Sequence, residues 1–329
     1  MKKLFLSMLM PLAVLTASAQ SNDYNMVIEL NNGTKITLGD NDVENLTFNG
    51  DALSISGSTI ADLYSQIARL EVLFSQLRDI VSPGKTFTVN GVSFRMVKVA
   101  GGTFQMGATS EQGSDADDDE SPVHRVTLSN YYIGETEVTQ ELWYAVMGKR
   151  PTSDGDQWSS SYGLGDNYPA YNVSWNDCQT FITRLNQLTG QQFRLPTEVE
   201  WEFAARGGKN SLGYKYAGSN TIGDVAWYLD NIPSHSYGTA GYGTQPVANK
   251  SPNELGLYDM SGNVREWCKD WYGSYSYPDQ TNPVGPSSAS YRVTRGGAWD
   301  SYARDCRVSQ RSNSHPNGYS EGLGLRLAF

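Results

Sequence analysis

Residues 291–329 read YRVTRGGAWDSYARDCRVSQRSNSHPNGYSEGLGLRLAF. The two ends of this stretch, 292–299 and 323–329, are rich in Arg, Gly and large apolar residues and predict strands. Its middle is dominated by Ser, Asn, Asp, Tyr, His and Gly, which are typical of loops. A buried final strand ties the end of a chain into the core. We therefore expect the polar middle to be a displayed loop rather than a fraying tail.

The composition excludes several classes of protein. Of the 329 residues, 39% are hydrophobic, which is enough for one large or two modest folded units. The formal net charge is −10, and Lys and Arg form no cluster, so nucleic acid is excluded as a partner. No apolar run beyond the first residues is long enough to predict a membrane span.

A secretory signal peptide is predicted at the start of the sequence. Two lysines at 2–3, an apolar run over 4–15 and small residues at 17–19 follow the order of such signals. We expect residues 1–19 to be removed by cleavage near Ala19. The mature protein is then exported, and it lies in the periplasm, at the cell surface or outside the cell.

Three cysteines, Cys178, Cys268 and Cys306, lie far apart in the sequence. Their spacing contains no CxxC pair, so it predicts neither a metal ribbon nor a redox motif. Export permits one disulfide and would leave one thiol free. We favour buried apolar cysteines, with one bridge at most, over a reactive thiol.

Residues 20–57 and 58–82 form two short regions ahead of the main unit. The first contains β-rich runs with Asn-Gly turns, which predicts β-hairpins too small for a core of their own. In the second, apolar residues recur at spacings of three and four: Ile60, Leu63, Ile67, Leu70, Phe74 and Leu77. About three heptads are marginal for an isolated coiled coil, so two interpretations stay open. The helix either packs on its own chain or joins copies into a homo-oligomer through residues 58–80.

Residues 85–329 form one long unit with many turn signals and three predicted helices. Two of them cover 139–147 and 174–188, and each is followed closely by a glycine that ends it. The third opens with a capping box, in which Thr197 is the N-cap and Glu200 stands three residues later. The second helix has an apolar face formed by Trp175, Cys178, Phe181, Ile182, Leu185 and Leu188.

Eight short segments of this unit share a pattern of Gly, Trp, Arg and Glu. They are 101–107 (GGTFQMG), 137–139 (EVT), 173–175 (VSW), 194–198 (RLPTE), 201–208 (WEFAARGG), 256–267 (GLYDMSGNVREW), 295–297 (RGG) and 324–326 (GLR). In this order they resemble the formylglycine-generating enzyme family, also called sulfatase-modifying factor domains. The resemblance covers nearly all of 87–329. It implies an α+β, loop-rich fold of the C-type-lectin type, preceded here by the short β region and the helix.

The resemblance also implies an activity, from which this chain departs. Catalytic members oxidise a sulfatase cysteine to formylglycine with two cysteines that bind copper just after the Gly-Gly strand. Here residues 300–305 contain no cysteine, and Cys306 alone cannot supply a dithiolate copper site or disulfide exchange. We therefore predict no copper and lean against an enzyme. A second branch of the family uses a three-histidine iron site, which the scattered His124, His235 and His315 do not match.

The calcium site of the family, carried over by position, falls on Asp259, Gly262, Val264 and Glu266. The resemblance implies as ligands the carboxylates of the two acids and the carbonyl oxygens of the other two residues. Such a hard-oxygen set suits Ca²⁺. The alternative is that both acids cap or hydrogen-bond a buried turn.

The middle of the terminal stretch has a pattern of its own. Its polar and aromatic residues can each be encoded by the codon AAC after changes at adenines alone: Asp300, Ser301, Tyr302, Asp305, Ser312, Asn313, Ser314, His315, Asn317, Gly318, Tyr319 and Ser320. Residues of scaffold character stand between them: Ala303, Cys306, Arg307, Val308, Arg311 and Pro316. This arrangement resembles the variable region of ligand-binding proteins diversified by retroelements, several of which use this same domain. The alternative is an ordinary loop, whose composition is similar.

The sequence thus predicts an exported, non-catalytic binding protein whose terminal loop contacts a protein or glycan ligand. Aromatic residues supply contact area at low entropy cost, and small polar residues adapt to the ligand. The predicted contacts are Trp299, Asp300, Ser301, Tyr302, Asp305, Asn313, His315, Asn317 and Tyr319. Two alternatives remain: a formylglycine-generating oxidase that acts on a sulfatase cysteine, and a structural component of a cell-surface assembly.

Overall fold

The computed structural model describes residues 83–151 and 158–329 in full and, ahead of them, only the backbone of five strands. These strands are β1 (Val14–Ala17), β2 (Met26–Glu29), β3 (Lys35–Leu38), β4 (Asn45–Asn49) and β5 (Ala52–Ser56). β2 pairs antiparallel with β1 and β3, and β4 pairs antiparallel with β5. The chain divides into two compact units, Met1–Ile80 and Val81–Phe329. The helix predicted over 58–80 lies outside the described residues, as does the predicted signal peptide apart from β1.

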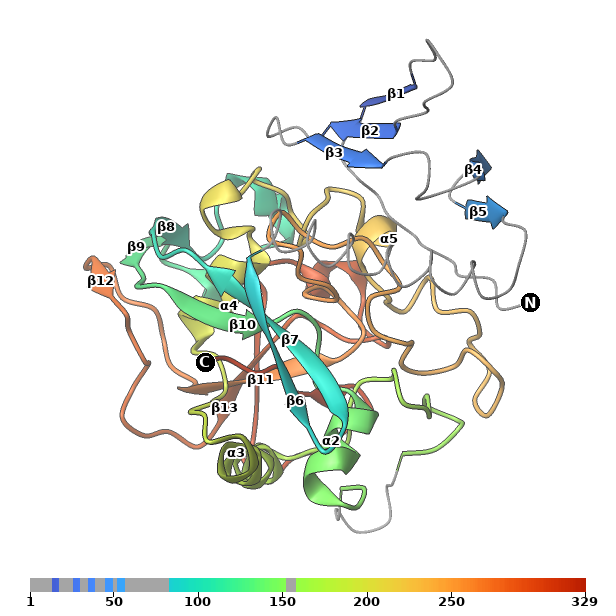
Figure 1. The fold of residues 1–329 in the computed structure, drawn as a ribbon. Helices are drawn as coiled ribbons and strands as arrows, with labels where there is room; N and C mark the ends of the chain where they lie inside the picture. The colour runs from blue at the N-terminus through green and yellow to red at the C-terminus, as the bar shows by residue number, and fades with distance from the viewer. Residues whose placement is uncertain are drawn as a thin grey trace. The chain divides into compact units, whose positions relative to one another are not determined.

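Three sheets lie in the larger unit (Figure 1). The first has the order β10-β7-β6 and consists of β6 (Gly84–Val89), β7 (Val92–Val99) and β10 (Tyr131–Gly134). The second has the order β12-β9-β8 and consists of β8 (Thr103–Met106), β9 (His124–Thr127) and β12 (Gln280–Thr281). The third has the order β14-β13-β11-β15 and consists of β11 (Arg265–Trp271), β13 (Arg292–Arg295), β14 (Arg311–Ser314) and β15 (Leu323–Gly324). Because all these strands are short, long loops carry much of the fold.

The three predicted helices are confirmed together with their caps. They are α2 (Gln140–Met147), α3 (Trp175–Thr189) and α4 (Glu198–Ala205). The side chains of Thr139, Ser174 and Thr197 each accept a hydrogen bond from a backbone N–H of the first turn, as N-caps do. α2 and α3 end at Gly148 and Gly190, which adopt the left-handed conformation. A short helix, α5 (Ile222–Val225), is also present. The described residues contain four 3-10 turns: η1 (Ser110–Asp115), η2 (Asp118–Glu120), η3 (Gly208–Asn210) and η4 (Ala303–Cys306). The predicted loop-rich α+β architecture is confirmed.

Helix α3 packs its apolar face into the core. The rings of Trp143 on α2 and Phe181 on α3 stack with centroids 4.9 Å apart, and Leu185 is fully buried. The prediction that Leu188 belongs to this face is wrong, because its side chain is 48% exposed. The buried face of the helix ends one turn before its last residue.

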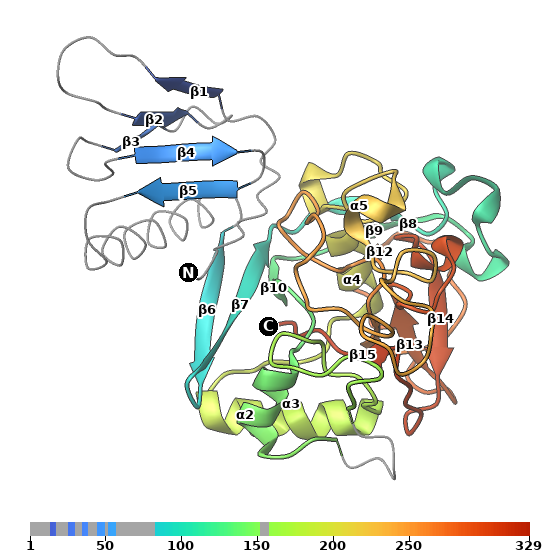
Figure 2. The same cartoon turned by 90° about the vertical axis from the view of Figure 1, so that its right-hand side faces the viewer.

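Two glycines shorten the first predicted strand of the terminal stretch. β13 ends at Arg295 because Gly296 and Gly297 adopt φ angles of 97° and 71°, which L side chains rarely take. A Cβ atom on Gly297 would also lie 2.6 Å from the Sγ atom of Cys306. The chain therefore leaves the sheet at these glycines and returns to it as β14, which pairs antiparallel with β13 (Figure 2).

The last residues of the chain are tied into the core, as expected, although β15 itself is only two residues long. The Gly134 N–H donates to the carbonyl oxygen of Leu327 at 2.8 Å, and Phe329 and Tyr132 exchange two backbone hydrogen bonds of 2.9 and 3.1 Å. Leu327 is buried. The polar middle of the terminal stretch is thus held at both ends.

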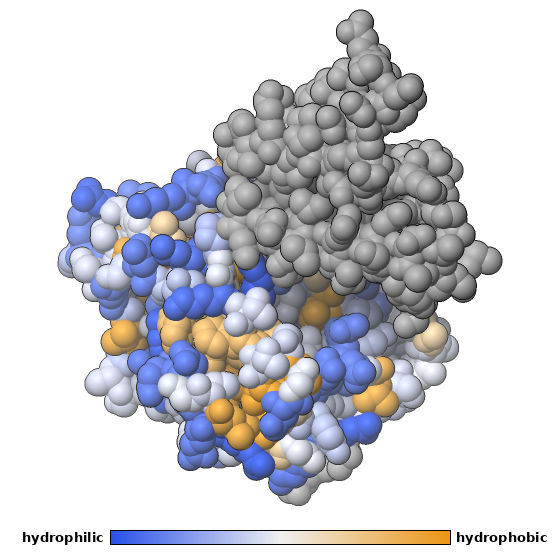
Figure 3. Space-filling view, in the orientation of Figure 1, coloured by the Kyte–Doolittle hydropathy of each residue, from blue (hydrophilic) through white to orange (hydrophobic). Residues whose placement is uncertain are grey.

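Hydrophilic residues cover most of the described surface on the face in Figure 3, and hydrophobic residues gather in its middle. Across the parts of the chain that the structure describes, no helix is both long and apolar enough to cross a membrane.

Two leucines on α3 provide a matched test of this packing. Leu185→Ala should lower the free energy of unfolding by about 2–5 kcal/mol, because it leaves a cavity in a close-packed core. Leu188→Ala should change it by no more than about 0.5 kcal/mol, since that side chain is half exposed. Urea denaturation of both variants measures the difference. Equal losses would show that α3 packs differently.

Candidate ligand-binding site

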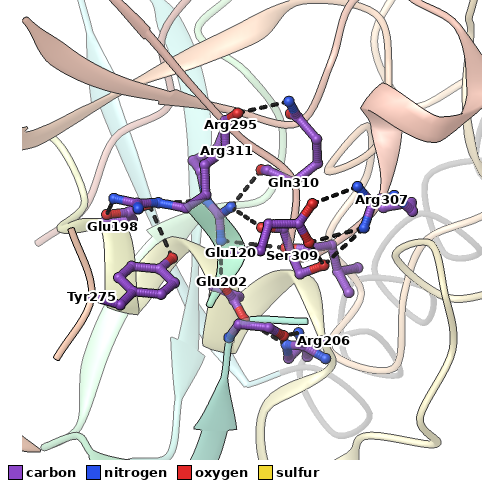
Figure 4. A network of polar contacts seen from close by, with 12 residues as sticks. Glu120, Glu198, Glu202, Arg206, Tyr275, Arg295, Arg307, Ser309, Gln310 and Arg311 are labelled. Atoms are coloured by element: carbon purple, nitrogen blue, oxygen red, sulfur yellow. Dashed lines mark hydrogen bonds and ion pairs between the residues drawn. The ribbon is translucent and has the colours of Figure 1, made fainter. Parts of the chain in front are cut away.

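Buried arginines hold the terminal stretch in place (Figure 4). Arg295, Arg307 and Arg311 are at most 4% exposed, and all three come from this stretch. Each reaches an acid elsewhere in the chain. The Arg311 guanidinium donates to both carboxylate oxygens of Glu198 on α4, at 2.6 and 3.0 Å. Such bidentate, charge-assisted pairs fix both distance and orientation.

The other two arginines complete the network. Arg307 binds both carboxylate oxygens of Glu120, at 2.9 and 2.5 Å. Arg295 forms an ion pair with Glu202 of α4 and donates through Nη1 to the carbonyl oxygen of Ser309 at 2.7 Å. The stretch is therefore anchored through side chains at both ends of its first loop, where it has little regular structure.

Glu198 and Glu120 remain ionised despite burial. Burial alone would raise the pKa of Glu198, but the guanidinium groups of Arg311 and Arg295 outweigh it and hold the pKa below the ordinary value. Glu120 behaves in the same way, since hydrogen bonds from Arg307 and Ser309 offset its burial and lower its pKa. Opposite charge and hydrogen bonds both favour the carboxylate. These interactions are therefore buried ion pairs rather than neutral hydrogen bonds.

Glu202 extends the network to the segment 101–107, which contains β8 of the second sheet. Its Oε1 atom accepts from the Gly107 N–H at 2.9 Å and from Arg206 at 2.8 Å. Arg206 also binds the partly exposed Glu111 at 2.6 Å. One fully buried carboxylate thus joins α4, the segment at 101–107 and the terminal stretch.

A second buried cluster contains the two acids predicted to bind calcium. Glu266 receives Arg326 on both carboxylate oxygens, at 2.7–3.0 Å, and accepts from the Trp201 indole at 2.7 Å. Asp259 accepts the Ala248 N–H on Oδ2 at 2.7 Å. Both oxygens of Glu266 are thus occupied by hydrogen bonds within the buried turn, which was the alternative to calcium binding for this residue.

Some buried carboxylate oxygens around Asp259 have no hydrogen-bond donor from the protein. Asp259 Oδ1 and both oxygens of Glu137 are buried without a hydrogen-bond partner. Burial, reinforced for Glu137 by the Asp259 carboxylate, raises both pKa values, to about 6 for Asp259 and well above its ordinary value for Glu137. Among the described residues no three acidic, His or Cys side chains form a metal-binding group. Glu137 was absent from the predicted set, and it interacts electrostatically with Asp259 only through the fold.

The structure displays most of the predicted contact residues and hides two of them. Asp300, Asn313, His315 and Asn317 are exposed and Asp305 is half-buried, while Tyr302 and Tyr319 have exposed fractions of 61% and 39%. Trp299 and Ser301 are only 4% and 8% exposed.

Local packing explains the two hidden residues. Trp299 packs against Tyr242 with ring centroids 4.9 Å apart, and its indole donates to the Glu321 carbonyl at 3.2 Å. Ser301 accepts the Ala298 N–H on its hydroxyl at 2.9 Å and so closes a turn. Trp299, one of the predicted contact residues, is therefore covered by neighbouring rings rather than displayed.

The displayed residues lie along two segments with different neighbours. Asp300 lies beside Gly322, since a Cβ atom there would be 3.2 Å from its Oδ1. Asn317 lies against the start of α3, where its side-chain oxygen accepts from Asn176 at 2.5 Å. Asn176 was absent from the prediction because it becomes a neighbour only through the fold.

The cysteines offer no reactive thiol. Cys178, Cys268 and Cys306 are all free and buried. Burial raises the pKa of each thiol well above its ordinary value. Because the thiolate is the nucleophile and the metal ligand, such thiols are inert at neutral pH.

Comparisons with known proteins agree with this geometry. The family described as "Sulfatase-modifying factor enzyme 1-like domain" matches residues 86–329. Among curated relatives, "Chaperone protein LppX" of Paenibacillus barcinonensis is 31% identical and the match covers 72% of this chain and 89% of the relative. "Formylglycine-generating enzyme" of Streptomyces coelicolor is also 31% identical, with 70% and 88% covered. The solved structure "Treponema denticola variable protein 1" superposes with a TM-score of 0.62 at 34% identity, and the match covers 74% of this chain and 98% of that one.

Two acids that share Arg206 test the buried network. Glu202→Gln should lower the free energy of unfolding by about 3–5 kcal/mol, because the amide group places a donor against Arg295 and leaves a buried cation unpaired. Glu111→Gln should cost at most about 1 kcal/mol, since its carboxylate is partly exposed. Thermal and urea unfolding compare the two variants. A similar small loss in both would mean that Arg295 finds another acid.

Proposed function

This chain belongs to the family of sulfatase-modifying factor enzyme 1-like domains, and from that premise we propose that it is an exported, non-catalytic protein that binds a ligand through residues 300–320. The observation that carries the proposal is the alternation of anchored and displayed side chains in this segment. Arg307, Val308 and Arg311 are buried, whereas Tyr302 and His315 are exposed. A rigid scaffold with exposed polar and aromatic residues is how binding sites are built.

The same alternation supports diversification of the displayed positions. Exchange of an exposed residue leaves the buried ion pairs of Arg307 and Arg311 intact, so the fold tolerates it. Between them, the carbonyl oxygens of Val308, Ser309 and Gln310 accept hydrogen bonds from Arg295, so these residues belong to the anchor. The similarity to a protein named "variable protein 1" supports the proposal that residues 300–320 vary between copies of this gene.

The competing function is formylglycine generation, the activity named in a relative that is 31% identical. Three observations weigh against it. Residues 300–305 contain no cysteine, Cys306 is buried and free, and its pKa is raised by burial. A dithiolate copper site requires two accessible thiolates. Incubation with copper and a sulfatase-motif peptide discriminates the two functions, since an aldehyde product would establish the oxidase.

Calcium binding is proposed as a structural feature of the same domain. The unpartnered carboxylate oxygens of Asp259 and Glu137 are the donors that fit a cation, because a buried excess of carboxylate needs positive charge. The carbonyl oxygens of Gly262 and Val264 would complete the set. Glu266 contributes less than the resemblance implies, since Arg326 donates to both of its oxygens.

Single substitutions at displayed residues test the binding site. Tyr302→Ala, His315→Ala and Tyr319→Ala should weaken binding to the cells or extracts that bind the wild-type chain, by at least about tenfold for one or more of them. Their unfolding temperatures should stay unchanged, since these side chains are exposed. Tyr277→Ala is the control, because that ring is 82% exposed on a different loop. Unaltered binding in all three variants would remove the proposed function.

Calcium should stabilise the chain if the cluster holds it. At a concentration of 100 times the dissociation constant, a bound ion adds about 2.7 kcal/mol to the free energy of unfolding. We expect the unfolding temperature to rise with CaCl₂ over EGTA in the wild type and to stay constant in Asp259→Asn. Asp118→Asn, at an exposed acid of the 3-10 turn η2, should keep the full rise. A wild type indifferent to calcium would contradict the site.

A further inference from the structure

A cluster of aromatic rings from outside the terminal stretch lies against its first residues. Tyr242 contacts the Trp299 ring with centroids 4.9 Å apart. The ring centroids of Tyr162 and Tyr237 lie 5.5 Å apart, and each lies 5.8 Å from the ring centroid of Tyr242. Four rings from three segments of the chain therefore form one continuous aromatic group.

This group has a buried base and an exposed top. Trp299 and Ile232 are each 4% exposed and form the base together with Ala298. Tyr237 is 67% exposed, and Tyr242 is partly buried. A large aromatic ring that is mostly exposed, yet supported from below, is available to a partner at little entropic cost.

Hydrogen bonds fix the loop that carries Tyr237. His235 Nε2 bonds to the Leu229 carbonyl at 2.6 Å, and the Leu229 N–H donates to the carbonyl of Ser301 at 3.0 Å. The hydroxyl of Thr239 bonds to the Ser236 carbonyl at 2.6 Å. The loop is thus attached to the terminal stretch beside Asp300, and the tyrosines share a surface with the proposed binding residues.

Acidic residues flank the rings. Asp230 follows Leu229 and Asp300 follows Trp299, and both are exposed. The backbone of Glu321 lies beside Trp299, since its carbonyl oxygen accepts the indole N–H at 3.2 Å. Arg265 lies across Gly322 from Asp300 and offsets one negative charge. Two exposed acids, Asp230 and Asp300, thus adjoin segments that contact the aromatic group, in a chain of formal net charge −10.

We propose that Tyr237 and the rings beneath it are a fixed part of the ligand site and that they receive lysine or arginine side chains of a protein partner. The inference rests on the proposed function and specifies the ligand class. Aromatic faces attract cations through the ring quadrupole, and flanking carboxylates complement a basic partner surface. Because these residues lie outside 300–320, they set a common preference for basic partners while the terminal loop selects among them.

A pair of peptides tests the charge requirement on the purified full-length chain. The probe is an acetylated, amidated Arg-Gly-Arg-Gly-Arg peptide, and its partner has citrulline in place of each arginine. Citrulline keeps the shape and removes the charge, so we expect binding at least tenfold weaker by fluorescence anisotropy. Failure to bind the arginine peptide, or equal binding of both peptides, overturns the proposal.

Variants at the aromatic group locate the contact. Tyr237→Ala should weaken binding of the arginine peptide roughly 3- to 30-fold, Tyr237→Phe should keep it, and Tyr277→Ala should leave it unchanged. If Tyr237→Ala and Tyr277→Ala weaken binding equally, the peptide is held by the overall negative charge of the chain and not by the aromatic group. If Tyr237→Ala instead abolishes binding of an uncharged oligosaccharide, the partner class is glycan and the proposal is wrong.

The terminal loop supplies the comparison with the proposed function. If His315→Ala weakens capture of the cellular ligand and Tyr237→Ala does not, the proposed function stands and this inference falls. If Tyr237→Ala weakens capture and Tyr302→Ala, His315→Ala and Tyr319→Ala all leave it unaltered, the aromatic group binds without the loop, and the proposed function falls instead.

Discussion

Charge compensation between buried groups is the constraint on which this structure depends. The side chains of Arg295, Arg307 and Arg311 extend from the terminal stretch and form ion pairs with acids on α4 and η2. Each guanidinium in the interior requires its carboxylate, because an unpaired buried charge costs several kcal/mol. The positions of the acids therefore dictate where the stretch runs. Buried ion pairs therefore give one defined path to a segment that has little helix or strand. They also allow a large part of this domain to consist of loops.

Sequence alone predicted the features that depend on neighbouring residues. Helix starts at Thr139, Ser174 and Thr197 follow from capping chemistry within four residues. The packing of Trp299 could not be predicted, because its burial depends on Tyr242, which reaches it only through the fold.

The same limit applies to the polar clusters. The pairing of Arg311 with Glu198 joins residues 113 positions apart, and no local pattern identifies one acid among many. Glu137 was missed for the same reason, since it becomes a neighbour of Asp259 only after folding. The family resemblance identified the segments and their order, and the structure shows which of their charged side chains meet.

Backbone pairing at the very end of the domain has a consequence for biosynthesis. Tyr132, Gly134 and Val138 all obtain hydrogen-bond partners from residues 325–329, so the interior cannot close until those residues have left the ribosome. Pairings over such long sequence separations also slow folding. The larger unit therefore closes only when residues 325–329 are available to pair, so segments made early must wait for segments made late.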